Sequence, residues 1–186
     1  MTATPPTEIA LLPGDPTPRE VVERMIRVDH AGEYGARRIY QGQLAVLGRG
    51  AAAPVLRQMQ AQEEAHLAAF AALIARRRVR PTALLPLWHV AGFALGAATA
   101  AIGQRAAMAC TVAVEEAIDA HYAAQSARLG SDETALRDTI DTFRAEELEH
   151  RDIGLAHGAE QAPGYRLLSR LIKAGCRAAI AVSERI

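Results

Sequence analysis

The chain has 186 residues, a length that suits one domain and excludes a large multidomain enzyme. Its 21 lysines and arginines balance 21 acidic residues, so it lacks the basic excess of a nucleic-acid-binding protein, and we expect no nucleic-acid partner. Cys110 and Cys176 fit neither a CxxC motif nor a zinc-binding pattern, which indicates free thiols.

The N-terminal residues predict a disordered lead-in. Residues 1–16 are rich in proline and contain no lysine or arginine. They therefore have neither the basic start of a secretory signal nor the arginine-rich pattern of a transit peptide. We expect residues 17–186 to form a single folded domain.

Proline and glycine divide that domain into helical segments. Thr17, Pro18 and Glu20 match a capping box, which predicts a helix from there to about residue 47. Ser131 or Asp132 is expected to cap the fifth helix. Helices other than the first are predicted over residues 54–78, 84–103, 103–129, 131–157 and 165–184. No segment shows sustained period-two alternation, so the predicted fold is all-α.

Residues 81–104 carry no formal charge when His89 is neutral. The segment is long enough to cross a bilayer, but it could also lie at the membrane interface or be buried in the protein. Gly92 and Gly96 have the GxxxG spacing of a helix contact. Four arginines at residues 76–80 could meet anionic headgroups or simply stabilise the end of their own helix. The amphipathic segment 165–184 could share the same surface.

The chemistry is expected at two Glu-x-x-His motifs, Glu63–His66 and Glu147–His150. Residues three apart share a helix face, so each motif can direct two ligands to one point. Glu33 lies on the helix directly before the first motif, and Glu115 lies on the helix directly before the second. A tyrosine follows each of these two glutamates by seven residues. The chain therefore contains two repeated helical hairpins.

This ligand set is typical of a carboxylate-bridged dinuclear site in a four-helix bundle. Four ionised glutamates in a core would be prohibitive alone, whereas two divalent metals bring +4 against −4. Carboxylates and imidazoles suit iron or manganese. The predicted fold is a ferritin-like four-helix bundle with two extra helices. The predicted metal ligands are Glu33, Glu63, His66, Glu115, Glu147 and His150. The alternative is that these glutamates are surface charges on amphipathic helices.

Metal-bound histidines usually donate their second ring N–H to a carboxylate. Asp29, Asp119 and Asp152 are the candidates for that role, and the alternative is that they lie on the surface.

Several segments resemble the di-iron demethoxyubiquinone hydroxylases of ubiquinone biosynthesis, from about residue 20 to the end of the chain. The most specific is MIRVDHAGEYGA at residues 25–36. The others are residues 80–82, 86–88, 108–116, 146–154 and 174–177. Asp119 departs from the pattern, because relatives often carry a second histidine in this stretch. The resemblance implies the same six metal ligands.

The resemblance implies a monooxygenase that hydroxylates a polyprenylated 6-methoxy-3-methyl-benzoquinone. It further implies two iron ions per chain, O2 as co-substrate and NADH as electron donor. No glycine-rich dinucleotide motif follows a strand, so NADH would bind shallowly or unconventionally. Tyr122 could donate a hydrogen bond at the site or pass an electron, with His121 as its proton partner. Alternatively, Tyr122 fills the core and His121 lies at the surface.

We expect a peripheral or interfacial membrane protein on the cytoplasmic face of a bacterial inner membrane, or on the matrix side of a mitochondrial membrane in a eukaryotic host. Other ubiquinone-biosynthesis proteins are candidate partners. Two alternatives stay open at this point: a ferritin-like iron-binding protein or oxidase, and a non-enzymatic membrane-bound helical scaffold.

Overall fold

The computed structural model describes residue 12 and residues 14–186, and within them it contains helices and no strand. Most of the predicted lead-in at residues 1–16 lies outside the described residues, so the division into lead-in and domain stays a prediction. The helices are α1 (Pro18–Leu47), α2 (Ala53–Arg77), α3 (Leu85–Ile102), α4 (Gln104–Ser126), α5 (Thr134–Ala156) and α6 (Tyr165–Ser183). The all-α prediction is confirmed.

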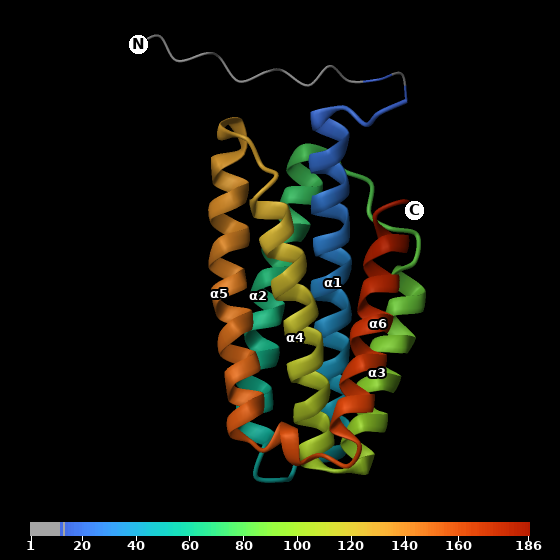
Figure 1. Cartoon of the computed structure of the whole chain (residues 1–186), viewed down its shortest axis with the longest axis vertical. Coiled ribbons are helices and arrows are strands. Elements are labelled where there is room, and N and C mark those ends of the chain that lie inside the picture. Colours follow the sequence, from blue (N-terminus) through green and yellow to red (C-terminus); the bar gives the residue numbers. More distant parts are fainter. Residues whose placement is uncertain (1–11, 13) are drawn as a thin grey trace.

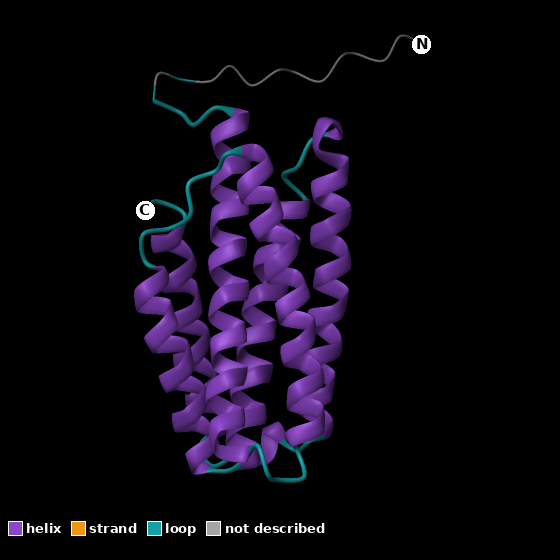
Figure 2. Cartoon of the chain, turned by 180° about the vertical axis from the view of Figure 1, so that it is seen from behind, coloured by secondary structure: helices purple, strands orange, loops and turns teal. Residues whose placement is uncertain are grey.

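Helices α1, α2, α4 and α5 form a four-helix bundle, and α3 and α6 lie together along one side of it (Figures 1 and 2). Helix α1 packs against α2 and α3, and α4 packs against α5 and α6. Each predicted hairpin therefore carries one additional helix, so the repeating unit has three helices. Helices α1 and α4 run in opposite directions through the bundle (Figure 1).

The helix starts follow local chemistry. The Thr17 hydroxyl accepts the N–H of Glu20 at 3.3 Å, and the Glu20 carboxylate accepts the N–H of Thr17 at 2.8 Å, so the predicted capping box is present. The predicted cap of the fifth helix is wrong. Residues Ser131–Glu133 form a 3-10 turn, closed by the Glu133 N–H and the Thr134 hydroxyl, and α5 begins only at Thr134.

Among the described residues the core has three apolar clusters, and two of them lie toward opposite ends of the bundle. Toward one end lie Tyr40, Leu56, Met59, Met108 and Val112, among others. Toward the other end lie Met25, Ile26, Phe70, Tyr122, Leu136 and Ile140, among others. In the sequence of each bundle helix, the predicted ligands fall between the residues of these two clusters. The polar centre is therefore closed off from the bundle ends by apolar side chains.

Helix α3 lies against α1 at backbone contact distance. A Cβ atom at Gly96 would overlap the carbonyl oxygen of Ile39, and one at Gly92 would lie 2.8 Å from the carbonyl oxygen of Gly35. The GxxxG spacing is thus a real helix contact, because only glycine leaves room for the neighbouring backbone.

Helix α3 is the one helix in the described part of the chain that is long and apolar enough to cross a membrane, by length and composition alone. Only 17% of its residues are buried, so burial in a core does not explain its composition. Leu87 and Val90 on α3 are exposed, as are Leu167 and Leu171 on α6. The side of the molecule formed by α3 and α6 is therefore largely apolar.

The glycine contact gives a stability prediction. Gly96→Ala should lower the free energy of unfolding by about 1–3 kcal/mol, the usual cost of overpacking, because its methyl group meets the α1 backbone. Gly35→Ala on α1 is the control, because an added Cβ there meets nothing within 4 Å. It should raise the free energy of unfolding by up to about 1 kcal/mol through helix propensity. Urea unfolding followed by circular dichroism measures both, and a shift of the same sign for the two variants would contradict the close contact.

Candidate metal centre

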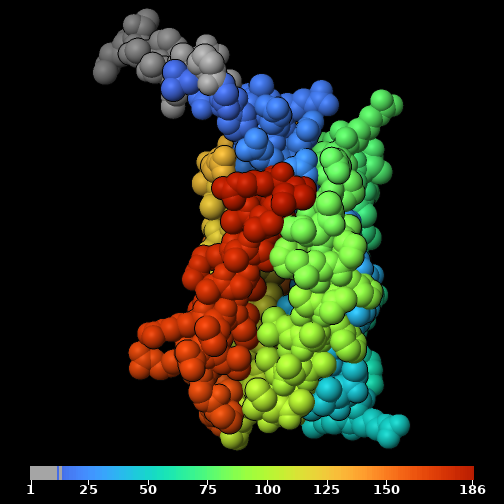
Figure 3. Space-filling view, turned by 90° about the vertical axis from the view of Figure 1, so that its right-hand side faces the viewer, coloured from blue at the N-terminus to red at the C-terminus, as the bar shows by residue number. Residues whose placement is uncertain are grey.

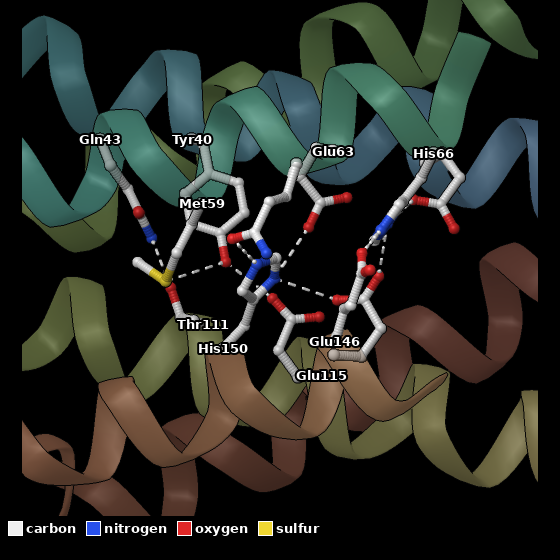
Figure 4. Close-up of polar contacts among 12 residues, drawn as sticks. Tyr40, Gln43, Met59, Glu63, His66, Thr111, Glu115, Glu146 and His150 are labelled. Carbon is white, nitrogen blue, oxygen red and sulfur yellow. Dashed lines mark hydrogen bonds and ion pairs between the residues drawn. The ribbon is translucent and has the colours of Figure 1, made fainter. Parts of the chain in front are cut away.

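The six predicted ligands converge in the middle of the bundle. Figure 4 labels Glu63, His66, Glu115 and His150 among them. Helix α1 supplies Glu33, α4 supplies Glu115, and α2 and α5 supply the two Glu-x-x-His motifs. None of the six is more than 1% exposed. The alternative that these glutamates are surface charges is therefore excluded.

The ligand atoms form two overlapping groups. One comprises Glu33, Glu63, His66 and Glu147, and the other comprises Glu63, Glu115, Glu147 and His150. Within each group the candidate ligand atoms all lie within 4.8 Å of one another. Glu63 and Glu147 belong to both groups, which is the position that bridging carboxylates occupy in a dinuclear site.

The helical register excludes the neighbouring acids from the two groups. Glu64 is exposed, and Glu116 pairs with Lys173 of α6. Glu146 contacts the outer nitrogen of His66 and faces partly to solvent.

The carboxylates fit cations. Buried oxygen atoms of Glu33, Glu63 and Glu115 have no hydrogen-bond partner among the described residues. Burial and the neighbouring carboxylates raise the pKa of Glu63 and of Glu115 well above the usual value. Charged carboxylates at this density require a counter-charge, and oxygen donors with two imidazoles suit iron or manganese.

The histidines direct Nδ1 inward. Nδ1 of His66 lies 3.1 Å from Glu147 and 3.5 Å from Glu33, and Nδ1 of His150 lies 3.2 Å from both Glu63 and Glu147. Burial opposes the charge on His66, but hydrogen bonds to Glu147 and Glu33 raise its pKa to about 11. Burial likewise opposes the charge on Glu147, but His150 and His66 lower the pKa of its carboxyl to about 2. In the metal-free protein a proton on His66 therefore stands where a cation would bind.

Two tyrosines cross between the repeats. Tyr40 of α1 donates its hydroxyl to Glu115 of α4 at 2.9 Å, and Tyr122 of α4 donates to Glu33 of α1. Each tyrosine thus bonds the lone glutamate of the other repeat. The sequence predicts a role for Tyr122, whereas it identifies Tyr40 only as part of the repeat. Its position matching Tyr122 was the signal that could have identified it.

The outer ring nitrogens have partners that the sequence did not predict. Nε2 of His66 lies 2.5 Å from Glu146, and Nε2 of His150 lies 3.0 Å from Gln62 (Glu146 in Figure 4). The sequence predicts Asp119, Asp152 or Asp29 at these nitrogens. The structure instead pairs Asp119 with Arg144 and Asp152 with Arg151. Asp29 and Asp119 lie on α1 and α4, whereas the outer nitrogens face residues of the opposite Glu-x-x-His helix.

Asp29 belongs to a separate buried cluster beside Tyr122. Its carboxylate accepts a hydrogen bond from Gln125 at 2.8 Å and lies 3.3 Å from Nε2 of His121. Burial raises the pKa of Asp29 to about 6, although His121 and Gln125 oppose the shift. His121 is 15% exposed, so the cluster connects the core with the surface.

An apolar groove of about 500 Å³ runs between α3 and α6, with α1 and α4 as its floor (Figure 3). At one end the indole N–H of Trp88 donates to the Ser183 hydroxyl at 3.0 Å. Ala36, Ile39 and Val114 line the groove and also a small space beside Tyr40 and Glu115. Three small or aliphatic residues are thus the wall between the groove and the carboxylates.

Known proteins resemble the chain over most of its length. The family model for ubiquinone biosynthesis protein COQ7 matches residues 20–183. A 3-demethoxyubiquinol 3-hydroxylase of Rhodospirillum rubrum is 66% identical over 94% of this chain and 83% of the relative. The NADPH-dependent 3-demethoxyubiquinone 3-hydroxylase, mitochondrial, of Rattus norvegicus is 58% identical over 90% and 79%. The 5-demethoxyubiquinone hydroxylase, mitochondrial, of Saccharomyces cerevisiae is 43% identical over 89% and 78%.

Asp29 gives a pH-dependent prediction. The folded state holds the Asp29 proton more tightly than the unfolded chain, so this contribution to stability is present below pH 4 and is lost as the pH rises through about 6. An asparagine side chain in its place cannot ionise. Asp29→Asn should therefore gain stability relative to the wild type as the pH rises, on the order of 3 kcal/mol at pH 7.5 and much less at pH 4. Chemical denaturation at the two pH values measures this.

The matched control for Asp29→Asn is Asp152→Asn, whose side chain is 63% exposed. Its stability relative to the wild type should change little with pH. An Asp29→Asn difference that is flat across this pH range would show that Asp29 does not carry the shifted proton.

Proposed function

The chain belongs to the ubiquinone biosynthesis protein COQ7 family, and we propose that it hydroxylates the ring of a polyprenylated demethoxyubiquinone with O2 and electrons from NADH at a di-iron centre. The chain is an oxidoreductase, as its relatives' names indicate. The observation that carries the proposal is the apolar groove, which ends at a thin wall beside buried carboxylates and imidazoles. A storage protein or a scaffold would not need such a route.

Each of the two overlapping ligand groups would hold one iron, and Glu63 and Glu147 belong to both groups. Bound iron would pass electrons from NADH to O2 for the hydroxylation. The chain supplies the surroundings. Tyr40 and Tyr122 hold the carboxylates of Glu115 and Glu33 in place, and the apolar clusters exclude water. The described residues contain no strand, so NADH has no Rossmann domain there and would donate its electrons from a shallow site.

The groove suits the polyprenyl tail. Its volume lies within the usual range for small-molecule sites, and its lining is almost wholly apolar. With the tail between α3 and α6, the quinone ring would point toward Ala36, Ile39 and Val114, and small movements of these side chains would bring it to Glu115. His121 and Asp29 offer a proton route from the surface to the neighbourhood of Tyr122.

The same side of the molecule suits a membrane. Exposed leucines and valines of α3 and α6 flank the groove, so a quinone could pass from lipid into it. Backbone contact between α3 and α1 favours a helix that lies at the interface over one that leaves the bundle to span the bilayer. We place the protein on a bacterial inner membrane or, in a eukaryotic host, on the matrix side of the mitochondrial one. Other ubiquinone-biosynthesis proteins stay predicted partners.

Glu115→Gln tests the centre. Glutamine can still accept the Tyr40 hydrogen bond, but it brings no charge to a cation. We expect iron to fall below two ions per chain and hydroxylation of a demethoxyubiquinone, measured by product detection with NADH and O2, to fall at least about 100-fold. The metal-free variant should be no less stable than wild type, because a buried repelling carboxylate is gone. Glu116→Gln is the control and should keep both iron and activity. Full iron and full activity in Glu115→Gln would overturn the assignment.

Gly175→Leu tests the groove. Gly175 lines the groove, and a Cβ there meets open space, so leucine fills the tail route without a clash. We expect kcat/KM for a long-tailed quinone to fall more than about tenfold with the iron content unchanged, and a tailless quinone to be affected less. Ala178→Leu, on an exposed position of α6 outside the groove lining, should change neither value. Equal losses for the long-tailed and tailless quinones would argue against this tail position.

A further inference from the structure

The residue before the glutamate of each Glu-x-x-His motif contacts the histidine of the other hairpin. Gln62 precedes Glu63 on α2 and lies 3.0 Å from Nε2 of His150 on α5. Glu146 precedes Glu147 on α5 and lies 2.5 Å from Nε2 of His66 on α2. The two contacts occupy matching positions of the repeat, and each joins opposite hairpins.

Both contacts present an oxygen to the ring. An acceptor oxygen at Nε2 holds the proton on that nitrogen, which leaves the lone pair of Nδ1 for a cation. Nδ1 is the nitrogen that faces the shared carboxylates in both histidines. Gln62 and Glu146 therefore fix the same tautomer and orientation of the two rings.

The two contacts differ in charge. Glu146 offers a carboxylate and Gln62 a neutral amide, so only the contact at His66 has a charged acceptor. The two ligand groups otherwise have the same composition, three glutamates and one histidine. Phe143 stacks on His66, and Met59 holds the matching position in the other repeat, but both side chains are uncharged.

We propose that Glu146 and Gln62 are positioning residues that make the two metal positions unequal, so that a divalent cation binds more tightly beside His66 than beside His150. The anionic partner makes the His66 imidazole the stronger donor and adds negative charge to that half of the site. The inference rests on the metal centre of the proposed function. Because the Glu146 side chain is 36% exposed, solvent screens part of its charge, and we expect an affinity ratio of about tenfold rather than 100-fold.

Titration of the metal-free full chain with Co2+ tests the proposal without turnover, through the visible absorption of bound cobalt and calorimetry. The wild type should bind two ions with affinities about tenfold apart. Glu146→Gln should weaken the tighter site and bring the two together. Gln62→Glu should strengthen the weaker site, and the double exchange should restore the inequality. Gln62→Glu tests the proposal independently, so the experiment stays decisive even where Glu146→Gln folds poorly.

Two further variants show which ligand group each of the two affinities belongs to. Glu33→Gln removes a ligand found only in the His66 group, and Glu115→Gln removes one found only in the His150 group. Adding Glu146→Gln should weaken the remaining ion about tenfold in the Glu115→Gln background and hardly at all in the Glu33→Gln background. Glu149→Gln, an exposed position on the same helix, is the charge-matched control and should leave both affinities unchanged.

The outcomes separate this proposal from the function. Two equal affinities, or equal effects of Glu146→Gln and Glu149→Gln, would overturn the inequality even in an active hydroxylase. Unequal sites with the predicted response would support it even where no hydroxylated quinone forms. Failure of the wild type to bind Co2+ would overturn both the inequality and the metal centre.

Discussion

Four carboxylates buried together in a dry helical core are the constraint that organises this molecule. Each would be costly alone, and their mutual repulsion adds to the cost. The surroundings offset this with two histidines that point Nδ1 inward and two tyrosines that donate to Glu33 and Glu115. Apolar clusters above and below keep water out. These contacts leave the four carboxylates with a net negative charge, which bound metal ions would neutralise.

The same constraint explains the groove. A hydrophobic substrate must approach the carboxylates without admitting bulk water to the site. Helices α3 and α6 line an apolar path, and Ala36, Ile39 and Val114 separate its floor from Tyr40 and Glu115. Glycines let α3 lie against the α1 backbone, so one wall of the path is fixed in place.

Much of this could be predicted from the sequence, because it depends on local periodicity. Glu63 and His66 must share a helix face, and the repeat aligns them with Glu147 and His150. The all-helical fold follows from the same spacing. What could not be predicted depends on contacts between distant segments. Gln62 and Glu146 contact histidines 88 and 80 positions away in the sequence. The groove exists only once α3 and α6 lie side by side. The predicted start of α5 is wrong for a local reason, because Ser131–Glu133 form a 3-10 turn where the helix cap was expected.

The crossed tyrosine bonds also bear on how such a chain can arise. Tyr40 donates to the glutamate of the second repeat and Tyr122 to that of the first, so neither tyrosine bonds the glutamate of its own repeat. Two identical three-helix subunits paired about a two-fold axis would make the same bonds between chains. Gene duplication and fusion of such a subunit would preserve every crossing contact. Only after fusion can the two copies diverge separately, and a glutamine facing one histidine with a glutamate facing the other is a difference that no symmetric dimer could encode.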